Sequence, residues 1–322
     1  MKFIRTFSLL FIVVLLCGCT ATSKAPLTKT GFYFDTIIEI TLYDKKDGTT
    51  LDECFSLCEK FEQQISRTVL DSEISRINAA NGKPVKVSDS TIELLKKGIA
   101  YGELTDGVFD ITIAPLSILW DFKNNPGNLP SDDEIIDTLS HVNYKNIVIH
   151  ENTVTLTDPN AAIDLGGIAK GYIADKLKEY LLSQGVKSAL INLGGNILTV
   201  GEKPDGSDFH IGIQKPFDKQ NAPITSVSIK DSSVVTSGSY ERYFEVDGIL
   251  YHHILNTKTG FPCDTGLLSV TILSDSSVDG DALSTSCFAL GLENGIELIK
   301  SLDDIDAIFV TETYEIYDTR TE

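Results

Sequence analysis

The sequence AAIDLGGIAKGYIAD, residues 161–175, joins an apolar segment to two adjacent glycines and the start of a helical repeat. Residues 154–163 predict a strand that stops at Asp164, and the apolar spacing from Ile168 predicts a helix. Glycines between a strand and a helix let a ligand approach the backbone, with free N–H groups at the helix start. Lys170 would lie in the first helical turn, where a cation is unfavourable unless an anion binds nearby. The stretch therefore predicts either a phosphate site or a plain strand-to-helix turn with a solvated lysine.

The N-terminus predicts an exported protein. Two basic residues precede an apolar run, residues 7–16, which is too short to span a bilayer and is typical of a signal peptide. The run ends in Leu-Cys-Gly-Cys, which resembles the lipobox of bacterial lipoproteins. We expect a signal peptide over residues 1–18, a lipidated Cys19 and a tether over 19–30, holding the protein on the outer face of the cytoplasmic membrane. The alternative is an ordinary cleaved signal with a chance cysteine.

Composition limits the ligands. A net charge of −19 excludes a nucleic-acid-binding protein, which needs a basic surface. An anionic ligand entering so acidic a protein needs a stronger cation than one lysine, so we expect a divalent metal near Lys170. Cys54 and Cys58 lie one turn apart on an expected helix, a spacing wider than a relaxed disulfide, and are predicted to be core residues.

The order of elements predicts one continuous α+β body over residues 31–322, without a long linker or an internal repeat. Ser88 or Asp89 is expected to cap a helix, and Ser131 with Glu134 forms a capping box. Asp247-Gly248 is a two-residue hairpin turn. Other expected elements are a single strand over 31–43, a helix over 51–65, a hairpin over 146–157, a strand over 188–192 and a helix over 280–290.

Two late segments carry candidate chemistry. Asp281 and Thr285 lie one helical turn apart, and their oxygens are donors suited to Mg²⁺; the plainer interpretation is that Asp279 or Asp281 caps the helix. His252 and His253 are adjacent on a strand and point to opposite faces, so one can face a phosphate pocket as a general base.

Six segments of the chain form a set of motifs in a fixed order. They are residues 109–112 with Pro115 and Trp120, residues 164–171, residues 192–196, residues 237–242, residues 253–256 with 259–262, and residues 281–285. In this order they resemble the motifs of the FAD:protein FMN transferases, the ApbE-type flavin transferases. The resemblance runs from Phe34 to the helix after Asp281.

The resemblance implies an α+β fold of mixed or antiparallel sheets, related to the T-fold, and an Mg²⁺-dependent enzyme. That enzyme transfers FMN from FAD to a Thr or Ser hydroxyl of a partner protein and releases AMP. The implied partners are FMN-accepting domains of membrane redox complexes or of extracellular flavoproteins. The implied metal ligands are Asp281, the Thr285 hydroxyl and the Gly167 carbonyl, with His253 as base. The implied FAD contacts are Phe34, Thr68, Val108, Phe109, Asp110, Asp164, Lys170 and Leu255.

Two positions depart from the family pattern. Thr68 stands where many members have a tyrosine that stacks on FAD, and some relatives with a non-aromatic residue there resemble FAD hydrolases. Thr257 replaces a usual proline and predicts a looser turn. The alternatives are therefore an Mg²⁺-dependent FAD pyrophosphatase, which makes FMN and AMP, and a flavin-binding lipoprotein without turnover.

Overall fold

The computed structural model describes residues 25–45, 47–218, 220 and 222–321. The expected signal peptide over 1–18 and Cys19 lie outside these residues. Within the described part of the chain, no helix has the length and apolar character needed to cross a membrane.

An antiparallel sheet of eight strands forms the centre of the fold. Its order is β1-β2-β6-β7-β10-β13-β14-β15, and each neighbouring pair is antiparallel. The strands are β1 (Leu27–Tyr33), β2 (Thr36–Leu42), β6 (Ala189–Leu193), β7 (Asn196–Val200), β10 (Ser233–Gly238), β13 (Leu267–Ser274), β14 (Asp306–Thr311) and β15 (Ile316–Asp318).

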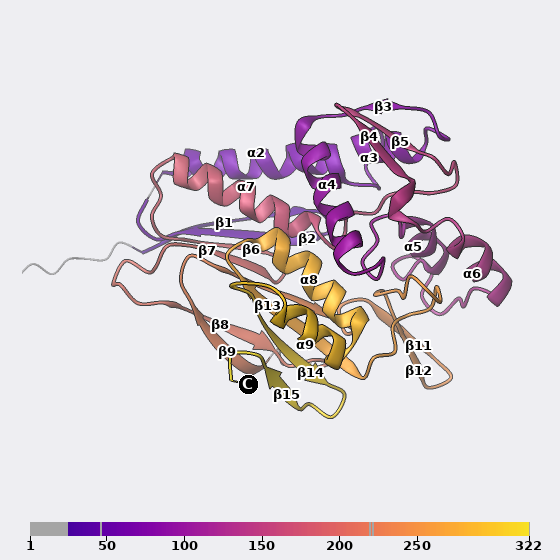
Figure 1. Ribbon diagram of the computed structural model, residues 1–322. Helices are drawn as coiled ribbons and strands as arrows, with labels where there is room; N and C mark the ends of the chain where they lie inside the picture. The colour runs from indigo at the N-terminus through magenta and orange to yellow at the C-terminus, as the bar shows by residue number, and fades with distance from the viewer. Residues whose placement is uncertain (1–24, 46, 219, 221, 322) are drawn as a thin grey trace, which may run out of the picture.

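Helices cover one face of this sheet, and a hairpin covers part of the other (Figure 1). The helices are α2 (Gly48–Ile65), α7 (Ala169–Ser183), α8 (Ser277–Leu290) and α9 (Leu292–Lys300). The hairpin of β8 (Phe209–Gln214) and β9 (Pro223–Ile229) packs its own apolar cluster against Val234 and Ile308. The expected α+β class with antiparallel sheets is confirmed.

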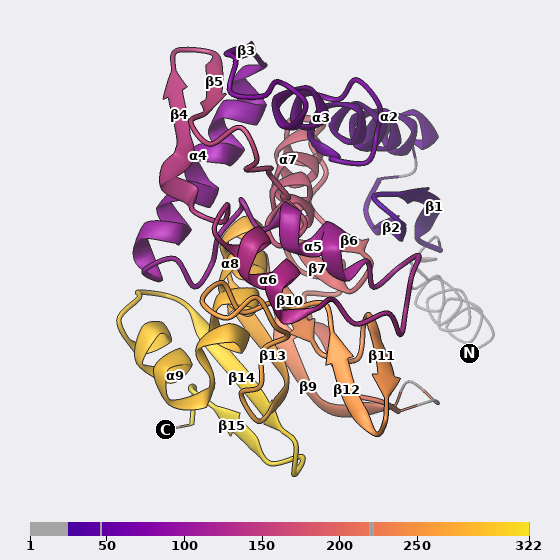
Figure 2. The same cartoon turned by 90° about the vertical axis from the view of Figure 1, so that its right-hand side faces the viewer.

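The remaining elements gather at one end of the sheet (Figure 2). A small sheet in the order β3-β5-β4 lies beside α3 and α4, and α5 and α6 lie between this group and the β11–β12 hairpin. These elements are α3 (Glu73–Asn78), β3 (Val85–Lys86), α4 (Asp89–Leu104), α5 (Ala114–Trp120), α6 (Asp132–Leu139), the 3₁₀ helix η1 (Tyr144–Asn146), β4 (Ile147–His150), β5 (Thr153–Leu156), β11 (Tyr243–Val246) and β12 (Ile249–His252).

Local sequence signals identified several boundaries correctly. Ser88 caps α4 by accepting a hydrogen bond from Thr91 N–H, and the capping box of Ser131 and Glu134 starts α6. Asp247 and Gly248 turn the β11–β12 hairpin with φ of 51° and 79°. Cys54 and Cys58 are buried and unbridged, as are Cys263 and Cys287.

The expected single strand over residues 31–43 is wrong. Residues 27–42 form the β1–β2 hairpin, which turns at Phe34 and Asp35 with φ of 53° and 59°. Both turn residues adopt the left-handed conformation, which usually selects Asn or Gly, so the pair Phe-Asp gave no turn signal. Strand β1 also begins at Leu27, which places residues 27–30 of the expected tether in the folded body.

Two further expectations are corrected. The strand expected over 154–163 ends at Leu156, and Ala162 makes only an isolated parallel bridge to Ile113. Strand β13 was not anticipated. It lies in the middle of the sheet with α8 packed on it, so its residues do not alternate between buried and exposed.

Helices α7 and α8 cross at Gly171. A Cβ at this position would lie 2.2 Å from the carbonyl oxygen of Ser277 and 2.6 Å from Val278 Cα, so only glycine fits. Close by, the Asp175 carboxylate accepts hydrogen bonds of 2.9 Å from Ser277 N–H and from Val278 N–H, capping α8 with a side chain of α7. The start of α8 is therefore fixed by α7.

We predict that Gly171→Ala destabilises the protein by about 1–3 kcal/mol or more, because the added methyl group forces the two helix backbones apart. Chemical denaturation measures the loss. Gly48→Ala is the matched control, since a Cβ at Gly48 meets nothing within 4 Å. Equal midpoints for the two variants would contradict the close crossing.

Candidate active site

Asp281 is the most enclosed carboxylate at the α7–α8 crossing, with a side chain 3% exposed. Its Oδ2 accepts a hydrogen bond of 3.0 Å from Gly171 N–H, and its Oδ1 lies 3.2 Å from Lys170 Nζ. The plainer interpretation, in which Asp279 or Asp281 caps α8, is wrong. The cap position is Ser276, and Asp279 instead binds Tyr101 and Lys97 of α4.

Lys170 is the cation of this cluster, on the first turn of α7. Its Nζ also donates to the Gly166 carbonyl at 3.4 Å. Burial acts to lower the pKa of Lys170, but attraction to Asp281 and to Glu241 outweighs it, and the pKa is raised. Lys170 therefore carries its positive charge at neutral pH, directly beside the glycine pair.

Thr285 and Gly167 lie next to one another, although they are far apart in the sequence. A Cβ at Gly167 would lie 3.5 Å from Thr285 Oγ1 and 3.2 Å from the ring of Phe109. Thr285 Oγ1 is 3.1 Å from Ser237 Oγ, at the end of β10. The structure therefore brings together Gly167, Lys170, Asp281 and Thr285, the residues predicted around a bound metal and phosphate.

Asp164 is held at the opening of the glycine turn. Its Oδ1 accepts from Gly166 N–H at 2.8 Å, and its Oδ2 pairs with Arg67 Nε at 2.7 Å. Sequence reasoning missed Arg67, although it precedes Thr68. The Thr68 hydroxyl lies 3.0 Å from Ser66 Oγ and offers no aromatic ring.

In the segment of residues 108–110, Asp110 has a structural role, because its carboxylate holds the loop by hydrogen bonds. The buried Asp110 carboxylate accepts hydrogen bonds from Thr112 N–H and Oγ1 and from Tyr144 N–H, at 2.6–2.7 Å. Burial raises the pKa of Asp110, and these hydrogen bonds oppose the rise. Its side chain braces the loop that presents Val108 and Phe109.

Two other residues predicted to contact FAD, Phe34 and Leu255, are held by a hydrogen bond and by apolar packing. Phe34 donates its N–H to Glu62 Oε1 at 2.6 Å from within the left-handed turn. Leu255 is 6% exposed and packs with Trp120 and Leu116. The turn after it is not loose, because Thr257 Oγ1 donates to the Gly107 carbonyl at 2.7 Å.

The two histidines have different environments, as their adjacency predicted. His252 is buried against Phe288, with Nε2 2.9 Å from the Cys263 carbonyl oxygen. His253 follows β12, and its backbone N–H donates to the Arg242 carbonyl at 3.1 Å. Its Nδ1 is buried without a hydrogen-bond partner in the described part of the chain. Burial, with the positive charge of Arg242, lowers the pKa of His253 to about 3, so its ring is neutral at neutral pH.

The oxygens at the α7–α8 crossing suit a hard divalent cation. No group of three or more His, Cys, Asp or Glu side chains able to hold a metal occurs in the described residues. Magnesium requires fewer, because it keeps waters and substrate oxygens among its ligands. Asp281 Oδ1 already faces a positive charge, from Lys170, and the Thr285 hydroxyl and Gly167 lie near each other. A carboxylate, a hydroxyl and a carbonyl therefore fit such an ion.

Comparison with known proteins matches this arrangement to one family. The sequence profile described as "ApbE family" matches residues 34–309. The chain belongs to the ApbE family. The FAD:protein FMN transferase of Klebsiella pneumoniae (strain 342) is 40% identical over 273 residues, covering 84% of this chain and 84% of that protein. The FAD:protein FMN transferase of Treponema pallidum is 32% identical, covering 93% and 89%.

Solved structures of ApbE proteins have the same fold. The ApbE protein of Thermotoga maritima superposes with a TM-score of 0.86 at 31% identity, covering 92% of this chain and 98% of that one. The flavin transferase ApbE of Vibrio cholerae superposes with a TM-score of 0.81 at 29% identity, covering 92% and 97%. The resemblance read from the motifs is confirmed.

We predict that His253 makes folding stability fall as the pH drops below about 6.5. The unfolded state takes up a proton near the ordinary histidine pKa of 6.5, whereas the folded state does so only near pH 3. Its contribution is complete above pH 6.5 and is lost toward pH 3, at up to about 1.4 kcal/mol per pH unit. Urea unfolding of wild type and of His253→Asn between pH 4 and 8 measures the difference. Parallel pH profiles would contradict a neutral, buried His253.

Proposed function

We propose that this protein is an FAD:protein FMN transferase, which moves FMN from FAD to a Thr or Ser hydroxyl of another protein and releases AMP. The observation that carries the proposal is the cluster of Lys170, Asp281 and Thr285 against the glycine pair. This cluster occurs in a chain 40% identical to a protein named for that reaction.

The reaction exchanges one bond to phosphorus for another. The acceptor oxygen bonds to the FMN phosphorus, and the bond from that phosphorus to the bridging oxygen breaks. The electron pair of the broken bond leaves with AMP, and the hydroxyl proton passes to a base. His253 would accept the proton, because its Nδ1 has no hydrogen-bond partner in the described residues and its ring is neutral. The negative charge of bound FAD beside Lys170 and Arg242 would have to raise the pKa of His253 from about 3 toward neutral for this role. Lys170 neutralises charge that develops on the pyrophosphate oxygens.

Magnesium completes this site in the proposal. Asp281, the Thr285 hydroxyl and the Gly167 carbonyl would hold the ion, which would supply charge neutralisation at the pyrophosphate. To accept the ion, Asp281 Oδ1 would have to exchange its contact with the Lys170 ammonium, whose side chain is 30% exposed. Asp281 Oδ2 stays fixed by Gly171 N–H.

The residues proposed to contact FAD are those that the family resemblance implies. Asp164 and Lys170 flank the glycine turn, and the Phe109 ring lies 3.2 Å from where a Cβ of residue 167 would stand. Phe34, Thr68, Val108, Asp110 and Leu255 complete the proposed set, with Asp110 acting by bracing its loop.

Hydrolysis of FAD to FMN and AMP is the second candidate function. Thr68 favours it, because this position offers a hydroxyl and no ring to hold the nucleotide by stacking. With water in place of the acceptor hydroxyl, the same cluster would perform hydrolysis.

Asp281→Asn tests the proposed function. The amide retains an acceptor for Gly171 N–H and removes the charge, so the fold should persist while AMP release falls at least about 100-fold. The measurement incubates purified protein with FAD, Mg²⁺ and a candidate acceptor domain, and follows AMP and protein-bound FMN. Wild-type rates in Asp281→Asn would contradict the assignment of Asp281 as a metal ligand.

In the same assay, His253→Asn should keep its affinity for FAD and lower the rate of FMN transfer about 10²–10⁴-fold.

The products separate the candidate functions. Covalent FMN on the acceptor supports transfer, AMP with free FMN supports hydrolysis, and intact FAD supports flavin binding without turnover.

Export to the outer face of the cytoplasmic membrane belongs to the proposal as well. The N-terminal signal-like segment and the cysteine at position 19 support it. Acceptors would then be exposed domains of membrane redox complexes or extracellular flavoproteins.

We predict that Cys19→Ser moves the protein from the membrane fraction to the soluble extracytoplasmic fraction, because it removes the lipidated thiol. Cell fractionation and mass spectrometry of the mature N-terminus check this. Cys17→Ser is the control, since only Cys19 would be lipidated. Equal membrane retention of both variants would contradict the anchor.

A further inference from the structure

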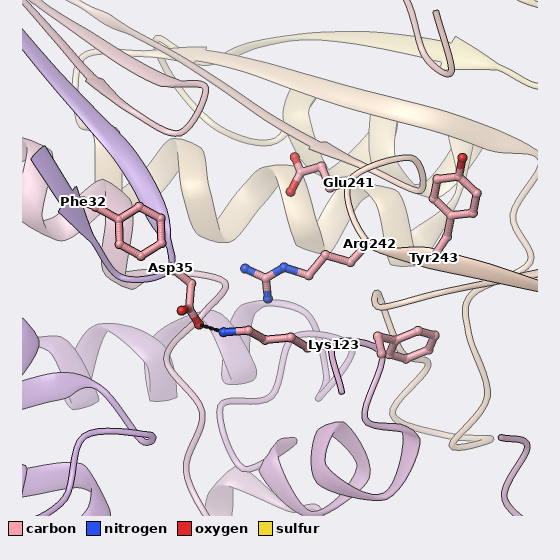
Figure 3. Close-up of a pocket in the computed structure, with 7 residues that line it drawn as sticks. Phe32, Asp35, Lys123, Glu241, Arg242 and Tyr243 are labelled. Carbon is pink, nitrogen blue, oxygen red and sulfur yellow. Dashed lines mark ion pairs between the residues drawn. The ribbon is translucent and has the colours of Figure 1, made fainter. Parts of the chain in front are cut away.

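A cavity of about 380 Å³ opens beside the candidate active site, and three separate segments form its walls. The β1–β2 hairpin contributes Phe32 and Asp35, and the chain after α5 contributes Phe122 and Lys123. The connection from β10 to β11 contributes Glu241 and Arg242, and the start of β11 contributes Tyr243 (Figure 3). This volume is near the lower end of the range of ligand pockets and suits a few side chains.

Arg242 is the cation of this cavity whose guanidinium forms no ion pair or hydrogen bond within the described part of the chain. Asp35 and Lys123 pair with each other at 2.7 Å, and Glu241 is attracted to Lys170 more strongly than to Arg242. In the described part of the chain, the exposed Arg242 guanidinium has no hydrogen bond or ion pair. Figure 3 shows it extending into the space between Glu241 and the Asp35–Lys123 pair. A planar guanidinium with free N–H groups matches a carboxylate bidentately.

The cavity adjoins the reacting groups. The Arg242 carbonyl accepts from His253 N–H at 3.1 Å, and the neighbouring Glu241 interacts with Lys170 and with Asp281. The positive charge of Arg242 also acts on the His253 ring. A molecule bound against the Arg242 guanidinium therefore lies near the proposed base.

The rim of the cavity has the composition of a protein interface. Phe32 is 67% exposed and pairs across the hairpin with Ile37, which is 65% exposed, and Tyr243 is 45% exposed. Aromatic residues and arginine are the residue types enriched at interface hot spots. Exposed apolar pairs of this kind favour a polypeptide partner.

We propose that this cavity binds the acceptor protein, with Arg242 holding a carboxylate of the segment that carries the acceptor hydroxyl. Phe32, Phe122 and Tyr243 pack on apolar side chains of that segment. The inference rests on the proposed transfer function and adds to it the site that selects the acceptor. Arg242 is a specificity-determining residue for the protein substrate and makes no essential contact with FAD.

Synthetic peptides test this inference. Each peptide has a single Thr and one Asp placed at successive positions on either side, and a matched series has Asn in place of Asp. With wild type, FAD and Mg²⁺, Asp at a fixed offset should lower the KM for peptide labelling about 10- to 100-fold relative to Asn. Arg242→Gln should abolish that difference, with the FAD dissociation constant unchanged. Arg242→Lys should keep part of it.

Arg76→Gln is the matched control, because Arg76 is exposed on α3, away from the cavity. It should leave both the peptide preference and the FAD affinity as in wild type. Thermal unfolding of all three variants verifies folding.

Other outcomes overturn the inference. Equal labelling of the Asp and Asn peptides by wild type would contradict recognition of a carboxylate. Loss of FAD affinity in Arg242→Gln would show that Arg242 binds the nucleotide instead. If a folded acceptor domain is labelled but no peptide is, the enzyme recognises the folded domain and not a short segment, which contradicts the inference. Failure to label any peptide or domain, with FAD intact or hydrolysed, would instead reject the proposed transfer function.

Discussion

The backbone contact between α7 and α8 at Gly171 sets the position of the Asp281 carboxylate and of the polar cluster around it. Because residue 171 has no Cβ, α8 approaches closely enough for Asp281 to accept the Gly171 N–H. This hydrogen bond fixes one carboxylate oxygen and leaves the other facing Lys170. Asp175 holds the same crossing from the next turn by capping α8. The distance between the glycine turn and the late helix is thus set by backbone packing, and the polar cluster follows from it.

Much of this arrangement could be predicted from the sequence, because its signals are local. The glycine pair before a helical repeat, the capping box at Ser131 and the Asp247-Gly248 turn each depend on a few neighbouring residues. The adjacency of His252 and His253 also predicted different environments for their two rings, and these differ in the structure. Motif order supplied the long-range part, since nothing in the spacing alone places Asp281 beside Lys170.

The failures have a common physical cause, which is tertiary context overriding local pattern. Strand β13 is buried in the middle of the sheet and shows no alternation. Arg67 is an ordinary surface residue in the sequence and becomes part of the site only through its pairing with Asp164. The cavity beside Arg242 joins three segments more than eighty residues apart in the chain, and no short sequence window contains them.

The left-handed backbone at Phe34 has a further consequence. This conformation costs a residue with a Cβ about 1–2 kcal/mol relative to glycine. A chain optimised for hairpin stability alone would have Asn-Gly at this turn. Phe34 and Asp35 place an aromatic ring and a carboxylate at the tip instead, and the carboxylate pairs with Lys123 across the cavity. The hairpin tip therefore gives up some conformational stability to place a charged side chain opposite Lys123, and the Asp35–Lys123 pair ties the β1–β2 hairpin to the chain after α5.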